Sequence, residues 1–200
     1  MLASSVWRGT ERRWFLGGLF LGAGITATIA VLVGAVVRPL LPGPARVVAV
    51  VLLAAVVLPG ELGAYRLRLP QAARQVRQWI SEEGAGGALQ FGVEMGTGFR
   101  TFSTSNLPHL ALVALALNPE PAIGLAVAAG FATGRAMMTI GRAGSPDPEA
   151  WDADWAASER RILRLLAAAA AVALPHALGW AVGWAVGWAA WLPRLASGGG

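Results

Sequence analysis

The feature that most constrains this chain is an uncharged apolar block that runs from Trp14 to Val37. At about 1.5 Å per residue, a helix of this length crosses a hydrocarbon core of about 30 Å. The block is longer than the apolar core of a signal peptide and no small-residue cleavage site follows it, so we expect a retained span. Hydrophobic residues make up 56% of the chain and charged residues 14%, a balance that favours a membrane protein.

Four further apolar blocks follow, separated by prolines and charged segments. They cover residues 47–65, 86–117, 121–141 and 165–192. The third block is too long and too polar in its middle for one regular helix, so we expect a broken span there. The sequence therefore predicts an all-α, polytopic membrane bundle of about five spans, folded as a single domain over residues 1–200.

Two polar segments between these blocks have the pattern of helices that lie on a membrane surface. Residues 70–83 combine one apolar face with arginines opposite, which favours contact with anionic lipid headgroups. Residues 148–160 follow Asp147, a predicted helix cap, and place Trp151 and Trp155 toward the membrane. The acidic residues of this segment lack the spacing of a loop that binds a metal, so we expect no metal site.

The distribution of arginines between the two sides of the membrane predicts the orientation of the chain, which contains no lysine. With five spans and the N-terminus inside, the cytoplasmic arginines are Arg8, Arg12, Arg13, Arg66, Arg68, Arg74, Arg77, Arg142, Arg160, Arg161 and Arg164. Those outside are Arg38, Arg46 and Arg194. The excess favours an N-in, C-out protein of a bacterial cytoplasmic membrane, and the net charge of +5 reflects this topology rather than nucleic-acid binding.

Polar side chains inside the predicted spans are the best guide to function, because charges are costly there. The candidate polar cavity consists of Glu94, Arg100, Thr101, Ser103, Thr104, Ser105, Asn106 and Arg135. Glu94 and Arg135 lie about 12 Å and 9 Å from the cytoplasmic ends of neighbouring spans, which predicts an ion pair. That pair could lock the two spans together or take part in transport, whereas Arg100 adjoins a run of hydroxyl side chains.

Both histidines occur in the tripeptide Leu-Pro-His, and both fall near the predicted bilayer midplane. His109 and His176 could form a bis-histidine haem site or a proton relay. Alternatively, each is a polar residue hydrogen-bonded to backbone that its neighbouring proline has kinked. We expect no cofactor, with haem as the alternative, because only two ligands are available and no haem-attachment motif exists.

Small residues predict how the helices pack. Gly18 and Gly22, Gly92 and Gly96, and Gly130 and Gly134 are spaced as in GxxxG pairs that allow close helix contact. Such pairs could serve packing inside the protein, a homo-oligomer or contact with a membrane protein partner, and the sequence does not separate these uses. The repeat GWAVGWAVGWAAW at residues 179–191 places tryptophans at the outer interface, which is typical of a membrane anchor.

The run FGVEMGTGFRTFSTSNLPHLALVALAL, followed by GLAVAAGFATGRAMM, resembles the core of the bacterial inner-membrane thiol-disulfide electron carriers of cytochrome c biogenesis. The resemblance covers Leu89 to Met138 and implies broken helices around a central cavity. The chain contains no cysteine and has Ser105, Asn106 and Leu107 where the family has its reactive cysteine beside the proline. The resemblance therefore implies the architecture and not thiol exchange.

Two classes of function stay open. The first is a small transporter or permeation module whose polar path lies in the broken-helix bundle. The second is a non-catalytic scaffold or assembly subunit, with or without a cofactor, that packs against a membrane partner. An enzyme is not favoured, because no Ser/His/Asp set or other marked nucleophile is evident.

Overall fold

The described part of the chain is all α-helical. The computed structural model describes residues 9–70, 84–98, 105–118 and 120–196, with side chains placed as far as residue 174 except for Pro121. These residues form the helices α1 (Thr10–Val37), α2 (Gly43–Leu62), α3 (Gly84–Gly96), α4 (Leu107–Leu117), α5 (Pro121–Gly144) and α6 (Pro148–Ala196), with a short 3-10 helix η2 (Arg38–Leu40) after α1. The predicted all-α class is confirmed.

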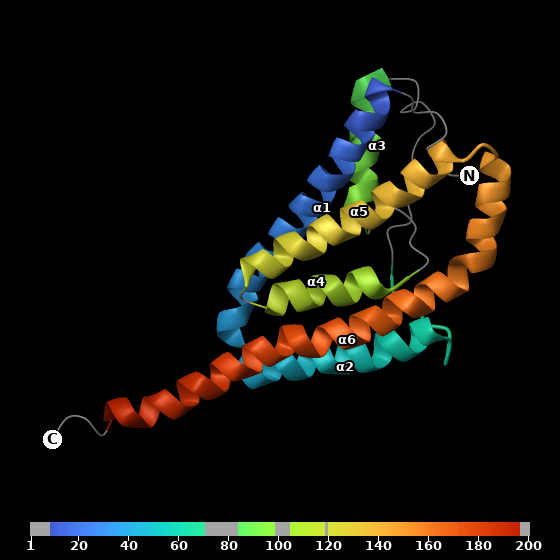
Figure 1. Ribbon diagram of the computed structural model, residues 1–200. Helices are drawn as coiled ribbons and strands as arrows, with labels where there is room; N and C mark the ends of the chain where they lie inside the picture. The colour runs from blue at the N-terminus through green and yellow to red at the C-terminus, as the bar shows by residue number, and fades with distance from the viewer. Residues whose placement is uncertain (1–8, 71–83, 99–104, 119, 197–200) are drawn as a thin grey trace.

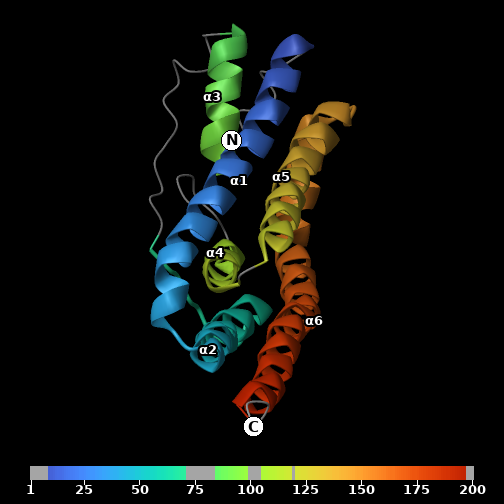
Figure 2. The same ribbon diagram turned by 90° about the vertical axis from the view of Figure 1, so that its left-hand side faces the viewer.

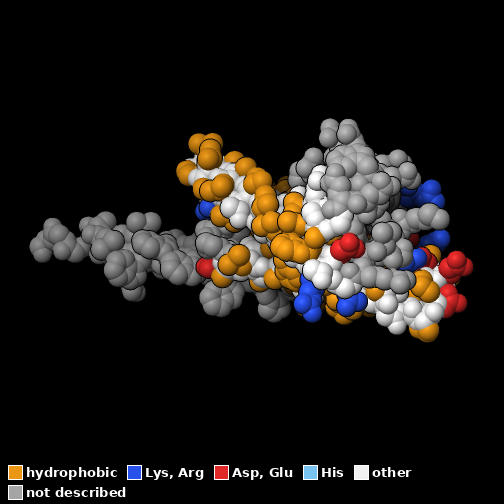
Figure 3. Space-filling view, turned by 90° about the horizontal axis from the view of Figure 1, so that it is seen from above, with side chains coloured by type: hydrophobic (Ala, Val, Ile, Leu, Met, Phe, Trp, Pro, Cys, Tyr) orange, Lys and Arg blue, Asp and Glu red, His pale blue; other side chains and the backbone are white. Residues whose placement is uncertain are grey.

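Three helices in the described residues are long and apolar enough to cross a membrane. They span Thr10–Leu40, Gly43–Leu62 and Ala122–Gly144, and they correspond to the first, second and fourth predicted spans. Large apolar side chains cover their outer faces; Leu32 is 62% exposed and Leu125 is 70% exposed. Figure 3 shows hydrophobic side chains along the middle of one face, with most of the drawn charges toward the end where α5 meets α6. This distribution suits a bundle surrounded by lipid.

The third predicted span is divided between two short helices. α3 has 13 residues and α4 has 11 residues. At about 1.5 Å per residue neither reaches across a core of about 30 Å alone. Figures 1 and 2 show that α4 runs in a different direction from α3, so the two helices do not form one rod.

α6 unites a predicted surface helix and a predicted span. It is one continuous helix of 49 residues, containing both residues 148–160 and the fifth predicted span. Figure 1 shows that it bends in its orange part, near its N-terminal end, and then runs beside α2. The predicted surface segment and the predicted span therefore differ in direction without an interruption in the helix. The other predicted surface helix, residues 70–83, lies outside the described residues apart from Pro70.

Prolines and a glycine mark several of the helix boundaries. Pro44, Pro108, Pro121 and Pro148 all lie in the first turn of their helices, where a missing N–H is tolerated. α2 ends at Gly63, whose φ of 98° is in the left-handed region that glycine adopts most easily.

α1 and α3 run parallel and approach each other through four glycines. A Cβ atom built on Gly18 would lie 2.9 Å from the Cα of Gly92, and one on Gly96 would lie 3.0 Å from the Cα of Leu19. Gly22 packs in the same way against Val93. We call Gly18, Gly22, Gly92 and Gly96 the glycine seam, and it accounts for two of the three predicted GxxxG pairs.

α5 packs against α1 in the opposite direction and uses alanines. Ala23, Ala27 and Ala30 of α1 form a buried cluster with Ala128 and Ala132 of α5. The third GxxxG pair, Gly130 and Gly134, points away from this cluster, and no atom of the described residues would lie within 4 Å of an added Cβ. The same spacing therefore serves packing inside the protein in one place and lies on an open face in another.

A separate apolar cluster joins α2 to α4 and α6. Val50, Ala54 and Val57 of α2 are buried with Leu110 of α4, and Leu174 of α6 packs against them. Figure 2 shows α4 between α1 and α5, directly above α2. α4 thus occupies the centre of the bundle, with its first turn next to the end of α2.

Candidate functional site

Arg135 lies between the two apolar clusters that flank α1. Its Nη1 is 3.6 Å from the sulfur of Met95 on α3. Its guanidinium carbon is 5.2 Å from the centre of the Phe131 ring, one helical turn earlier on α5. Met95 packs against the cluster around Phe15, and Phe131 packs against the cluster around Ala27. The charged group is therefore held in an apolar setting by a ring face and a thioether.

Phe131 also connects Arg135 to the end of α3. A Cβ atom built on Gly98 would lie 2.9 Å from the Phe131 ring, and Gly98 has a φ of 78° that glycine tolerates. The Thr26 hydroxyl of α1 donates a hydrogen bond of 3.3 Å to the carbonyl of Thr97. These contacts fix the end of α3 beside Arg135, where the chain enters the segment 99–104.

The predicted ion pair between Glu94 and Arg135 is not formed, although both residues are among those described. The only ion pair that the described residues show joins Arg142 to Asp152. Met95 rather than Glu94 reaches Arg135, because consecutive helical residues point about 100° apart. Similar depths along the two helices are compatible with contact, but the face of α3 decides which residue makes it.

A second polar group surrounds Asn106 at the start of α4. Asn106 is 6% exposed, and its Nδ2 donates to Glu61 Oε1 at 3.0 Å and to the carbonyl of Leu67 at 2.9 Å. Its Oδ1 accepts from the backbone N–H of Leu69 at 3.0 Å. The backbone N–H of Asn106 also donates to Glu61. One side chain thus ties the end of α2 and the segment after it to α4.

His109 lies one turn into α4 from Asn106. Its Nε2 is 3.1 Å from the carbonyl oxygen of Pro70, and its Nδ1 is buried without a hydrogen-bond partner. With Nε2 protonated, the ring donates to Pro70 and leaves Nδ1 as a buried acceptor. The side chain of His176 lies outside the described residues, so a contact between the two histidines stays a prediction.

Some of the remaining predicted site residues are described by the structure and others are not. Arg100, Thr101, Ser103 and Thr104 belong to residues 99–104 and lie outside it. Ser105 and Asn106 are described; the hydroxyl of Ser105 accepts a hydrogen bond of 3.1 Å from the backbone N–H of Leu107. The structure therefore places described polar groups on both sides of this segment, at the end of α3 and at the start of α4.

The contacts of Arg135 with Phe131 and of Asn106 with Glu61 were not predicted from the sequence. Phe131 and Arg135 are four residues apart, a spacing at which helical side chains meet, so this contact could have been predicted. Glu61 and Asn106 are 45 residues apart, and no local pattern indicates their contact. Glu61 was visible as a carboxylate at the end of an apolar block, but its partner depended on the tertiary fold.

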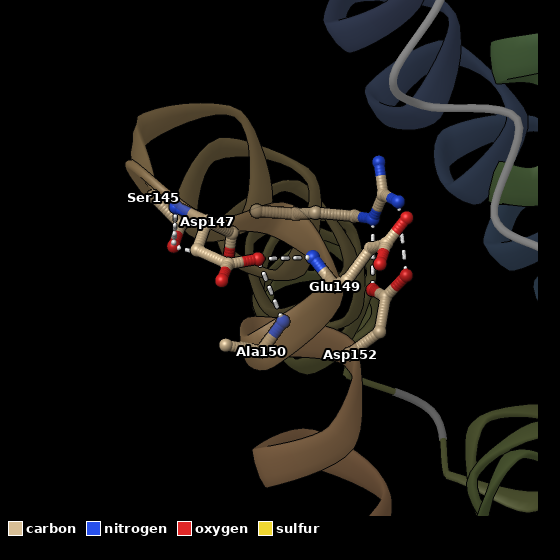
Figure 4. Close-up of polar contacts among 6 residues, drawn as sticks. Ser145, Asp147, Glu149, Ala150 and Asp152 are labelled. Carbon is tan, nitrogen blue, oxygen red and sulfur yellow. Dashed lines mark hydrogen bonds and ion pairs between the residues drawn. The ribbon is translucent and has the colours of Figure 1, made fainter.

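The turn between α5 and α6 is fixed by charged and polar side chains (Figure 4). Asp147 Oδ1 accepts hydrogen bonds of 3.0 Å from the N–H groups of Glu149 and Ala150, which confirms the predicted cap. Arg142 binds Asp152 through two hydrogen bonds of 2.7 and 2.9 Å. The hydrogen bond from Arg142 is the main reason that the pKa of Asp152 is lowered.

Trp151 and Trp155 complete this turn. Their rings stack with centroids 5.3 Å apart, and Trp151 lies 3.4 Å from the position of a Cβ on Gly141.

No family model, curated protein or solved structure matches this chain. The polar groups around Arg135 and Asn106 are therefore the guide to the function of this chain.

Proposed function

We propose that this chain is a five-span protein of a bacterial cytoplasmic membrane, N-terminus inside, that moves a small solute through its interrupted third span. The directions of the packed helices support the topology: α1 and α3 are parallel, whereas α5 runs opposite to α1 and α6 runs opposite to α2. This alternation agrees with the arginine distribution, which puts most positive charge on one side.

The observation that carries the proposal is the placement of polar groups at both borders of the interruption. Arg135 adjoins the end of α3 through Met95 and Phe131, and Asn106 with Glu61 adjoins the start of α4. Interrupted helices in transporters expose backbone and polar side chains to a solute at mid-membrane depth. Arg100 lies between these borders in the sequence and, with the hydroxyl residues Thr101, Ser103 and Thr104, would complete the polar path.

Reconstitution into lipid vesicles tests this function. We predict that Arg100→Ala abolishes solute flux in proteoliposomes and leaves the thermal unfolding of the purified protein unchanged. Arg12→Ala is the matched control, because it removes an arginine that is exposed at the start of α1. Flux that is equal in the parent protein and in Arg100→Ala would contradict the proposal.

The absence of cysteine makes a second test clean. Single substitutions such as Thr101→Cys and Thr104→Cys would carry the only thiol in the chain. A polar path predicts that a membrane-impermeant thiol reagent modifies these positions, whereas Leu19→Cys, inside the packed α1–α3 contact, resists modification. Ser5→Cys and Ser197→Cys should react from opposite sides of the membrane if the termini are inside and outside, respectively.

One observation favours the second candidate function, a non-catalytic scaffold or assembly subunit. The open face of α5 with Gly130 and Gly134 would accept a close helix from a membrane partner. The scaffold proposal predicts a stable co-purifying membrane protein after mild solubilisation, and no flux. Its cofactor-holding version predicts a haem absorption band that disappears in His109→Ala or His176→Ala.

The likeness to the thiol-disulfide carriers is a proposal about architecture alone. It is supported by the division of residues 86–117 into two helices, with Pro108 in the first turn of the second.

A further inference from the structure

Arg135 differs from the other described arginines in its surroundings. Its guanidinium meets a sulfur atom and an aromatic ring, and no carboxylate among the described residues forms an ion pair with it. A thioether is a weak acceptor, and a ring face attracts a cation without neutralising it. The positive charge of Arg135 is therefore left without an anionic partner from the described part of the protein.

The geometry also restricts how this charge can be used. A guanidinium has five N–H donors in one plane, and only the donor on Nη1 has an acceptor among the described residues, the sulfur of Met95. Phe131 covers the group from α5, and its ring is itself held by Gly98. A planar donor that is fixed by packing and not paired matches the two oxygens of a carboxylate or phosphate.

We propose that Arg135 binds the oxyanion group, carboxylate or phosphate, of a dissolved solute. The inference rests on the proposed transport function and names the class of solute that the path selects. Arg135 provides the positive charge and adjacent N–H donors for the two oxygens. Phe131 and Met95 keep the guanidinium in a fixed plane beside the end of α3. Glu94, one residue from Met95, does not compensate the charge, so the site favours anions over cations.

Flux measurements in proteoliposomes test the selectivity. Vesicles containing the full chain are supplied with labelled phosphate, acetate, rubidium or glycerol, and each flux is compared with that of protein-free vesicles. We expect flux of at least one of the two oxyanions, reduced about tenfold or more by Arg135→Gln, which corresponds to losing one charge-assisted contact. Arg135→Lys should retain anion preference with lower flux, and Arg12→Gln should behave as the parent.

The outcomes separate this inference from the transport function. Flux of glycerol or rubidium without oxyanion flux overturns the oxyanion assignment and leaves transport standing. Oxyanion flux that Arg135→Gln does not change also overturns the assignment. No flux of any probe contradicts transport itself and removes the basis of the assignment.

A binding measurement covers the case in which the substitution alters folding or flux indirectly. A ligand that binds only the native protein raises its unfolding temperature. Phosphate or acetate should raise the unfolding temperature of the parent and of Arg12→Gln, relative to chloride at equal ionic strength, but not that of Arg135→Gln. If the parent shows no such rise, the inference is wrong. If the effect of Arg135→Gln appears only with phosphatidylglycerol present, the bound oxyanion is a lipid headgroup and the solute assignment is wrong.

Discussion

The two halves of the interrupted third segment are attached to the bundle by different means. α3 is held along its length by the glycine seam, where its backbone touches the backbone of α1. α4 buries Leu110 and Leu115 in the two apolar clusters beside it, and it is also hydrogen-bonded at both ends. Asn106 binds Glu61 at its start, and Arg38 donates to the carbonyls of Ala116 and Asn118 at its end. A seam needs shape alone, whereas the ends of α4 need hydrogen-bonding partners that come from distant parts of the chain.

Glycine spacing and polar residues consequently differ in what they predict. Gly130 and Gly134 have the spacing of the seam glycines but meet no helix among the described residues, so spacing indicates only that a close approach is allowed. Asn106 shows no recognisable spacing, yet it makes three side-chain hydrogen bonds. The attachment of α3 should therefore be sensitive to volume, and that of α4 to the loss of polar groups.

The largest expected effect is on the seam. In Gly92→Leu the new Cβ would lie 3.0 Å from the Cα of Gly18, a backbone atom that cannot turn aside. We expect α3 to separate from α1 and the free energy of unfolding to fall by more than about 3 kcal/mol, as in severe overpacking. Thermal or denaturant unfolding in detergent micelles measures this loss.

Gly130→Leu is the matched control for the seam, because it makes the same chemical change on the open face. Leucine favours helix over glycine by up to about 1 kcal/mol, so this variant should be slightly more stable. A large loss of stability in Gly130→Leu would mean that the face is occupied, as the scaffold proposal requires. Equal effects at both positions would contradict the distinction between the two faces.

The next largest effect is at the start of α4. Asn106→Leu removes three side-chain hydrogen bonds and leaves the Leu69 N–H and the Glu61 carboxylate without this partner. We expect a loss of about 2 kcal/mol, because unsatisfied buried polar groups each cost about 1–3 kcal/mol and some rehydrate. Equilibrium unfolding of Asn106→Leu, Glu61→Gln and the double variant should show that the two effects do not add. Additive effects would argue against a direct Asn106–Glu61 interaction.

A smaller effect is expected at the end of α4. Arg38 Nη1 lies 3.2 Å from the Ala116 carbonyl and 3.0 Å from the Asn118 carbonyl, where the helix leaves acceptors unpaired. Arg38→Met should lower the free energy of unfolding by about 1 kcal/mol through the loss of these charge-assisted bonds. Arg46→Met is the control, because Arg46 Nε is buried without an acceptor and its removal should cost less. A greater loss in Arg46→Met would reverse this assignment.

The same division between local patterns and distant contacts explains what the sequence could predict. The apolar blocks predicted α1, α2 and α5 to within a few residues, and Asp147 predicted the start of α6, because length and capping are local properties. The partner of Arg135 was predicted wrongly, since depth along a helix says nothing about which face meets the neighbour. The Asn106–Glu61 contact joins residues 45 positions apart and needed the tertiary arrangement.

The smallest expected effect on stability is at the turn after α5. The Arg142–Asp152 pair fixes this turn, just as hydrogen bonds fix the ends of α4. The hydrogen bond from Arg142 lowers the pKa of Asp152 below its ordinary value of 3.8. A carboxylate with a depressed folded pKa stabilises the protein above its unfolded pKa, and this contribution is lost as the pH falls through the folded pKa.

Asp152→Asn should therefore be slightly less stable than the parent at neutral pH, and the difference should disappear as the pH falls below about 4. Unfolding temperatures of both proteins across this range measure the difference, and added salt should reduce it because the Asp152 side chain is 40% exposed. A difference independent of pH would assign the effect to packing near Trp151 rather than to the ion pair. The turn would then resemble the glycine seam, held by shape, and not the polar ends of α4.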